Sequence, residues 1–138
     1  MAWTGVKTDW KSDDYFNIAD YNRIVGNIEY LREQASELFG AITLKDVPTS
    51  KTVNDKIFAS EITAIESNVY LLNTKTYKFT KYEVGEQKRY TANGKTQNYE
   101  DMNRIEELII KLYDTMTVHK ANITRLAVRL GGQKGFKV

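Results

Sequence analysis

The sequence contains no cysteine, one histidine and one proline among 138 residues. Without cysteine the chain can form neither disulfide bonds nor a thiolate metal site, which is typical of a protein that folds in the cytosol. Because His119 is the single histidine, a two-histidine metal site or a Ser–His–Asp triad would lack a required group. We expect an ordinary surface histidine there, and we expect the adjacent carboxylates Glu106 and Glu107 on an exposed helix surface. We therefore predict no enzyme, no metal and no cofactor.

Long apolar runs are also missing. No run approaches the ~20 residues that a membrane-spanning helix needs. Hydrophobic residues make up 41% and charged residues 28% of the chain, a balance that favours a folded soluble protein over a disordered one. A chain of this length is usually one domain, so we predict a single domain over residues 1–138. The net charge of +2 argues against bulk electrostatic attraction to nucleic acid.

One stretch near the start of the chain returns near its end. Seven of the fifteen residues in 17–31 are identical in 98–112, at an offset of 81 residues. A weaker copy lies midway, over 59–72, where four residues align with matching positions of the first copy: Ile65, Asn68, Val69 and Leu72 fall where Ile24, Asn27, Ile28 and Leu31 fall. A period near 40 residues indicates one supersecondary unit that is used three times.

Each copy has the pattern of an amphipathic helix, because its apolar residues recur at spacings of three and four. Asn17 and Asn98 suit the N-cap position, and Asp20 and Asp101 follow three residues later, at the capping-box spacing. Gly40 suits the end of the first helix. The predicted repeated helices therefore cover residues 17–40, 59–74 (with Ser60 as the cap) and 98–118.

The pairs Asn22-Arg23 and Asn103-Arg104 occur in both strong copies but lie away from the apolar stripe. One explanation is an inherited duplication with local pairing. An ion pair from Arg23 to Asp20 would stabilise the helix by only about 0.2–0.5 kcal/mol. The other explanation is a dedicated contact of both pairs with a loop, a terminal arm or a neighbouring subunit.

Both tryptophans, Trp3 and Trp10, lie in residues 1–16, where neither helical nor alternating spacing fits. We predict an extended aromatic arm over these residues. Exposed indole rings are unfavourable in water, so the arm is expected to pack on the body of the protein or on a partner. Residues 41–57, which contain Pro48, are expected to form a connector.

Residues 76–96 have a different character. Tyr77, Phe79, Tyr82 and Val84 stand among lysine and threonine, which is typical of β-strands. An Asn-Gly pair at 93–94 favours a tight turn. We predict a β-hairpin or flap here. The predicted fold class is mainly α with a small β element (α+β), in which three repeated amphipathic helices are accompanied by this β-rich insert.

The end of the chain is basic. After Asp114 there is no acidic residue, and five basic residues give the last 24 residues a charge of +5: Lys120, Arg125, Arg129, Lys134 and Lys137. The spacing of Ile123, Leu126 and Leu130 fits a helix, but β-branched neighbours weaken that case, and we favour an extended segment that ends at Gly131-Gly132. The basic segment 119–138 suits a phosphate backbone or an acidic protein surface, and the alternative is a solvated terminus.

Four stretches together resemble a known group of proteins: Trp10-Lys-x-x-Asp-x-Phe-Asn-x-x-Asp-Tyr-Asn-Arg-Ile24, Ala59-Ser-Glu-Ile-x-x-Ile-Glu-x-Asn68, Asn103-Arg-Ile-Glu106 and Arg125-Leu-Ala-Val-Arg-Leu-Gly131. They are similar to small structural proteins of the tail and baseplate modules of bacteriophages and prophages of Gram-positive bacteria. The likeness covers most of the chain and thins over residues 41–57 and 76–96. It implies a virion building block, present in several copies and in contact with other tail proteins, without a cofactor or a catalytic residue.

We therefore predict a non-enzymatic virion structural protein that forms a homo-oligomer, contacts other tail or baseplate proteins and has no membrane association. The alternative function is a nucleic-acid-binding accessory protein that uses the basic C-terminal segment. Aromatic residues and arginine dominate interface energetics. The predicted partner-binding residues are the two tryptophans, the repeated Asn-Arg pairs and two late arginines: Trp3, Trp10, Asn22, Arg23, Asn103, Arg104, Arg125 and Arg129.

Overall fold

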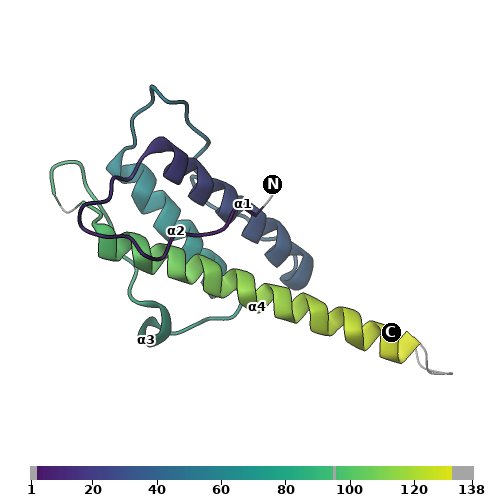
Figure 1. Cartoon of the computed structure of the whole chain (residues 1–138). Helices are drawn as coiled ribbons and strands as arrows, with labels where there is room; N and C mark the ends of the chain where they lie inside the picture. Colours follow the sequence, from purple (N-terminus) through teal and green to yellow (C-terminus); the bar gives the residue numbers. More distant parts are fainter. Residues whose placement is uncertain (1–2, 95, 132–138) are drawn as a thin grey trace.

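The computed structural model describes residues 3–94 and 96–131, with side chains described up to Leu126. Its helices are α1 (Ile18–Phe39), α2 (Ala59–Lys75), the single turn α3 (Lys81–Val84) and α4 (Tyr99–Gly131) (Figure 1). The helices α1, α2 and α4 each contact the other two and form a three-helix bundle. With 33 residues, α4 is the longest, and its C-terminal part projects beyond the bundle (Figure 1).

The first and third repeats begin with the same capping box. Asn17 Oδ1 accepts the Asp20 N–H at 3.0 Å, and the Asp20 carboxylate accepts the Asn17 N–H at 3.2 Å. Asn98 and Asp101 repeat this exchange at 2.9 and 3.1 Å. Each box satisfies two main-chain donors that the helix itself leaves without partners. Gly40, with a φ of 93°, follows the last residue of α1, as the sequence pattern predicts.

The second repeat begins differently. Its N-cap residue is Phe58 rather than the predicted Ser60, which lies inside the first turn of α2. Glu61 accepts the Phe58 N–H at 2.9 Å, but the phenyl ring offers no acceptor in return. The box is therefore half made, and the start of α2 relies on the carboxylate of Glu61 near the positive end of the helix dipole.

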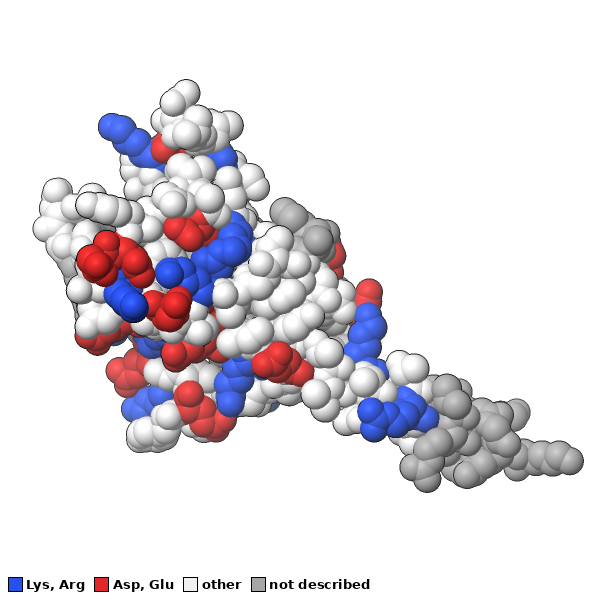
Figure 2. All heavy atoms as spheres, viewed as in Figure 1, with Lys and Arg blue, Asp and Glu red and all other residues white. Residues whose placement is uncertain are grey.

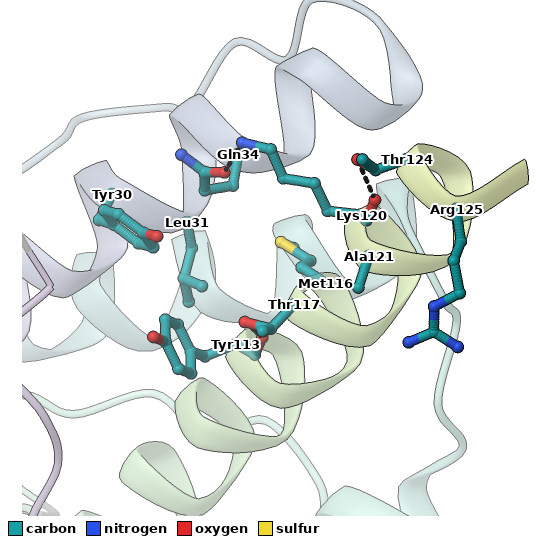
Figure 3. A pocket seen from close by; sticks show the side chains of 10 residues that line it. All are labelled: Tyr30, Leu31, Gln34, Tyr113, Met116, Thr117, Lys120, Ala121, Thr124 and Arg125. Atoms are coloured by element: carbon teal, nitrogen blue, oxygen red, sulfur yellow. Dashed lines mark hydrogen bonds between the residues drawn. The ribbon is translucent and has the colours of Figure 1, made fainter. Parts of the chain in front are cut away.

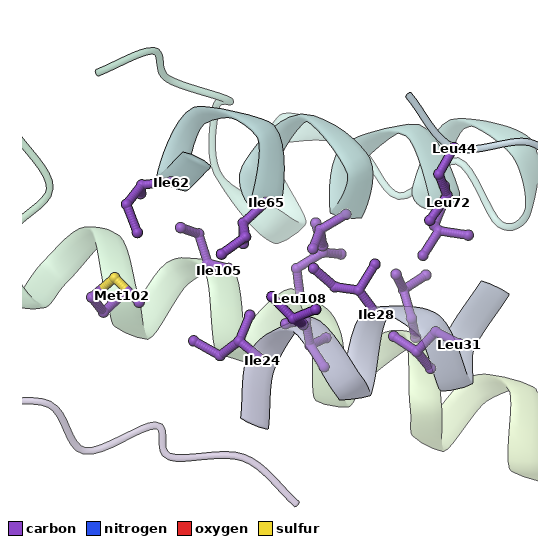
Figure 4. Packing of buried hydrophobic residues seen from close by; sticks show 14 of the residues in the cluster. Ile24, Ile28, Leu31, Leu44, Ile62, Ile65, Leu72, Met102, Ile105 and Leu108 are labelled. Atoms are coloured by element: carbon purple, nitrogen blue, oxygen red, sulfur yellow. The ribbon is translucent and has the colours of Figure 1, made fainter. Parts of the chain in front are cut away.

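The centre of the core is formed by equivalent residues from the three repeats. They point into the space between α1, α2 and α4 (Figure 4). Each such side chain contributes about 1.5–3 kcal/mol by leaving water. At three successive positions of the repeat, all nine side chains are at most 1% exposed: Ile24, Ile65 and Ile105; Ile28, Val69 and Ile109; Leu31, Leu72 and Leu112.

The predicted β element is wrong. Over residues 3–94 and 96–131 the structure contains helices and no strand, so the fold is all-α rather than α+β. The segment predicted as a hairpin, residues 76–96, is irregular apart from α3 and a turn at residues 92–94. Its aromatic residues do not share one face of a strand, because some pack against the helices and others are exposed to solvent. Tyr77 packs against Phe39 and His119, whereas Tyr82 is 89% exposed.

Main-chain groups in this segment bond to helix side chains instead of to a second strand. Asn73 of α2 accepts the Phe79 N–H at 2.9 Å and donates to the Phe79 carbonyl at 3.0 Å. Tyr70 donates its hydroxyl to the carbonyls of Val84 and Gly85 at 3.0 and 3.1 Å. A strand pattern in the sequence carries no information about such partners, because they come from another element.

The preference for an extended segment before Gly131-Gly132 is also wrong, because α4 continues through Gly131. Gly132 lies outside the described residues. The β-branched threonines that weakened the helical prediction bond back to the helix. Thr117 and Thr124 each donate a hydroxyl to the carbonyl four residues earlier, at 2.8 and 3.0 Å. Such back-bonding lets threonine keep its hydroxyl satisfied within a helix.

Leucine-to-alanine substitutions should separate core from surface. Leu72→Ala removes a side chain with 0% exposure, and we expect the free energy of unfolding to fall by about 2–5 kcal/mol. Leu126→Ala, at 53% exposure, is the matched control and should change it by less than about 0.5 kcal/mol. Chemical denaturation monitored by circular dichroism measures both. Equal losses would contradict the packing described above.

Candidate functional site

The asparagines of the repeated Asn-Arg pairs hold irregular segments against the bundle. Asn103 of α4 accepts the Trp10 N–H at 2.8 Å and donates to the Trp10 carbonyl at 3.0 Å. Asn22 of α1 does the same with Lys51, at 2.7 and 2.8 Å. We call this arrangement a side-chain clamp: one side chain satisfies both main-chain groups of one residue in a segment that has no neighbouring strand.

Thr63 makes the third clamp. It occupies the position in α2 that Asn22 and Asn103 occupy in their helices, as the alignment of Ile65 with Ile24 requires. Its hydroxyl accepts the Tyr90 N–H at 2.9 Å and donates to the Tyr90 carbonyl at 3.1 Å. Because the residue type differs, sequence identity does not reveal this member of the set. The helical alignment alone could have found it.

The repeat also includes the segments that precede the helices. Each clamped residue follows, by five positions, a residue with a positive φ: Gly5 (82°), Asp46 (49°) and Gly85 (79°). Asn27 on α1 and the equivalent Asn68 on α2 bind the residue just before the positive φ. Asn27 accepts the Thr4 N–H at 3.1 Å, and Asn68 accepts the Lys45 N–H at 3.0 Å. One repeat unit is therefore an irregular segment followed by a helix.

The three segments occupy equivalent places around the bundle. Segment 4–10 bonds to α4 through Asn103 and to α1 through Asn27. Segment 45–51 bonds to α1 through Asn22 and to α2 through Asn68. Segment 84–90 bonds to α2 through Thr63 and to α4 through the Lys88–Asp101 ion pair. Each segment thus joins its own helix to the preceding one, and the first segment closes the ring.

Arg23 reaches across the ring to a buried carboxylate on α4. It forms an ion pair with Glu106, which is 0% exposed and also accepts the Lys7 N–H at 3.1 Å and the indole N–H of Trp10. The expected position of Glu106 on an exposed surface is wrong. Its neighbour Glu107 is the exposed member of the pair. The dedicated contact considered for Arg23 is therefore made within the chain.

Arg104 makes the equivalent contact between α4 and α2. It pairs with Glu66, which is 0% exposed and also accepts the Lys88 N–H and, at 3.0 Å, the Tyr90 hydroxyl. Arg104 donates further to the hydroxyl of Tyr70 at 2.9 Å. Glu66 and Glu106 occupy the same position of the repeat. Sequence analysis missed both as contact residues, although the aligned copies place a carboxylate in each.

Burial and ion pairing shift the pKa values of the groups around the Arg104–Glu66 pair. Burial disfavours the charge of Arg104, but its hydrogen bonds to Glu66 and Tyr70 outweigh that cost and raise its pKa. Burial, together with the charge of Glu66, raises the pKa of Tyr90. Burial also opposes the charge of Asp101, but bonds from Lys88 and from the Asn98 N–H outweigh it and lower the pKa of Asp101.

The third interface lacks both charged partners of this arrangement. Ala64 stands on α2 where the other helices carry Arg23 and Arg104, and Val25 stands on α1 where the others carry a buried glutamate. The main-chain donors to these glutamates are Lys7 in the first segment and Lys88 in the third, which lie one repeat position apart, and the second segment has Pro48 and Thr49 in their places. Without an arginine at position 64, a buried carboxylate at position 25 would lack its charged partner, so valine is the consistent residue.

Both tryptophans lie against the protein body. Trp10 is 4% exposed and belongs to the core. Trp3 stacks on Tyr113 of α4, with ring centroids 3.9 Å apart and an interplanar angle of 7°, and it also meets Tyr30 of α1. The aromatic arm therefore supplies the ring contacts that attach the first segment to the two helices it bridges.

Among the predicted partner-binding residues whose side chains are described, Arg125 alone is exposed. It lies on the projecting end of α4, and no ion pair with a described residue is found for it. Arg129 lies further along the same helix, with its side chain outside the described part, and Lys134 and Lys137 lie beyond the described residues. In Figure 2 this end of the molecule shows basic and uncharged atoms, whereas acidic and basic atoms mix over the bundle.

A groove of about 600 Å³ lies between α1 and α4 where the two helices separate (Figure 3). Lys120 reaches across it to Gln34 and Glu37 of α1, each at 3.0 Å. No aspartate or glutamate is among the described residues that line the groove. Its walls are mainly apolar, with Tyr30, Leu31, Tyr113, Met116 and Ala121, and they also include polar residues and the basic Lys120 and Arg125.

No family model, no curated protein and no solved structure matches this chain. Within the described residues, no group of three or more histidine, aspartate or glutamate side chains is arranged to hold a metal ion. None of the helices described is both long and apolar enough to cross a membrane. The geometry of the bundle and of the projecting helix is therefore the basis for a functional proposal.

Two glycines at equivalent positions of the first and third segments test the placement of Arg104 against the third segment. Gly5→Ala and Gly85→Ala both place a Cβ on a residue with positive φ, which costs about 1–2 kcal/mol. At Gly5 nothing lies within 4 Å of the new atom, but at Gly85 it would lie 2.5 Å from Cδ of Arg104. Gly85→Ala should therefore lower the free energy of unfolding clearly more than Gly5→Ala in denaturant titrations. An equal loss in both variants would argue against the placement of Arg104.

The lowered pKa of Asp101 predicts a pH dependence. A carboxylate with a folded-state pKa below its ordinary value of 3.8 stabilises the protein above that value, and the contribution is lost as the pH falls through the folded pKa. Asp101→Asn should therefore destabilise the protein at neutral pH by about 1–3 kcal/mol and flatten the fall in stability below pH ~4. The exposed residue Asp13 provides the control variant Asp13→Asn. If urea titrations show the same loss of stability at acid pH in Asp101→Asn as in the wild type, Asp101 is not the group responsible for it.

Proposed function

We propose that this protein is a non-enzymatic structural component of a bacteriophage tail or baseplate, which contacts other virion proteins through the projecting end of α4. The observation that carries the proposal is the uncovered apolar surface of that end. Val118, Ile123 and Leu126 are 59%, 47% and 53% exposed. Several large apolar side chains on a protruding helix favour burial against a partner.

The helical pattern supports the same conclusion. Ile105, Ile109, Leu112 and Met116 form the buried stripe of α4, and Ile123 lies on the same face two turns beyond Met116, after the polar positions His119 and Lys120. A stripe that packs a core in one half of a helix is suited to pack against another protein in its other half. The rest of the bundle uses its apolar stripes and most of its buried polar groups internally, which suits a rigid building block.

The class of assembly comes from the resemblance of the sequence to tail and baseplate proteins. Components of such assemblies repeat around a symmetry axis, so that a modest contact is multiplied over many copies. The alternative of nucleic-acid binding has less support. Of the two basic side chains described at this end, Lys120 is already paired with Glu37, and only Arg125 remains to meet a phosphate.

Purified phage particles from a lysate that expresses the protein test the proposal by mass spectrometry. The wild-type chain should be present in them. The double variant Ile123→Asp and Leu126→Asp should be incorporated at least about tenfold less, because charged groups replace an apolar contact of hot-spot strength. Its helix content by circular dichroism should be unchanged, since both side chains are exposed.

Val53→Asp is the matched control, because Val53 is 85% exposed and lies in the segment between α1 and α2. It should enter particles as the wild-type chain does. Absence of the wild-type chain from the particles would reject the proposed function. Normal incorporation of the α4 double variant would reject the surface assigned to it.

A further inference from the structure

The groove between α1 and α4 has the properties of a binding site for a helix. It forms where the two helices diverge, and its walls come from Tyr30 and Leu31 on one side and Tyr113, Met116 and Ala121 on the other (Figure 3). Main-chain groups along two helices are already bonded within each helix, so the walls offer no edge to which a strand could be added. An apolar occupant that satisfies its own main chain is a helix.

The charge of the groove specifies the occupant further. Among the described residues that line it, Lys120 and Arg125 are basic and none is acidic. Lys120 already bonds to Glu37, but Arg125 is exposed without a carboxylate partner among the described residues. Acidic side chains at the edge of an incoming apolar face would complement these cations and select it over a basic competitor.

A second copy of this chain does not fit that requirement. The part of a copy that protrudes is its own α4, which carries no acidic residue after Asp114. Two such ends would bring Lys120 and Arg125 of one chain toward those of the other. Like charges in contact disfavour the pairing, so the occupant has to come from a different protein.

We infer that the groove between α1 and α4 binds an acidic amphipathic helix of another protein. The apolar face of that helix lies on Tyr30, Tyr113 and Met116, and its carboxylates face Lys120 and Arg125. The inference rests on the proposed function, since it states the chemistry of the partner in the assembly. The surface is adjacent to the exposed Ile123 and Leu126 but is formed by other residues, so the two can be tested separately.

Two labelled peptides of about three heptads provide the probes, both with leucine at positions a and d. One carries glutamate at e and g, and the other carries lysine there. Fluorescence anisotropy with the full-length protein should show binding of the glutamate peptide at least about tenfold tighter than of the lysine peptide. Its affinity should fall as salt is added, because part of the contact is electrostatic.

Two variants locate the contact. Ala121→Glu places a carboxylate in the groove and should abolish binding of the glutamate peptide. Arg125→Glu should weaken that peptide about tenfold and strengthen the lysine peptide, because it inverts the complementary charge. Lys56→Glu, at an exposed position in the segment before α2, is the charge-matched control and should leave both affinities within about twofold of wild type. Circular dichroism should show unchanged helix content in all three.

Equal affinity for the two peptides, or binding that survives Ala121→Glu, would overturn the inference. So would tighter binding to a short DNA duplex that Arg125→Glu abolishes, or self-association of the protein through the same residues in light scattering. Failure of the peptide experiment with the wild-type chain present in particles would reject the acidic helix and leave the proposed function standing. Peptide binding by a protein that is absent from particles would reject the proposed function and keep the groove as a site for an acidic helix.

Discussion

The structure depends on one constraint: the main chain of three long irregular segments has no neighbouring strand and still requires hydrogen-bond partners. The helices supply them through side chains. Clamps from Asn22, Thr63 and Asn103 each satisfy both main-chain groups of one residue, and buried Glu66 and Glu106 accept further N–H groups. An unsatisfied buried polar group costs about 1–3 kcal/mol, so these side chains specify where each segment lies.

The side-chain clamp is repeated at all three interfaces of the bundle, but within the described residues the buried ion pair is found at only two of them. Two of the three interfaces contain an arginine, a buried glutamate and a main-chain donor to that glutamate. At the third interface Ala64 and Val25 stand in place of the arginine and the glutamate. A buried carboxylate without its charged partner is less stable than an apolar pair, which is why the two changes are consistent only together. The repeat therefore gains or loses the ion pair as a unit.

The proposed contact surface lies where the threefold repetition ends. α1 and α2 stop after 22 and 17 residues, whereas α4 continues to 33 and leaves its apolar stripe and the adjacent groove without a covering helix. Within the bundle the same stripe is buried by two equivalent neighbours. The bundle thus positions a helix whose projecting half exposes Ile123, Leu126 and Arg125. This division supports a structural role in a larger assembly.

The sequence by itself determined the repeat, the places of its three helices, two capping boxes and the apolar stripes, because helical periodicity and capping depend on residues a few positions apart. Tertiary structure decided the rest. The pattern of residues 77–84 suggested a strand. Instead, Asn73 and Tyr70 of α2 bond to the main chain of Phe79 and Val84. The same applies to Glu106, which local pattern placed on the surface. Its arginine lies 83 residues away, and only the closed ring brings the two charges together.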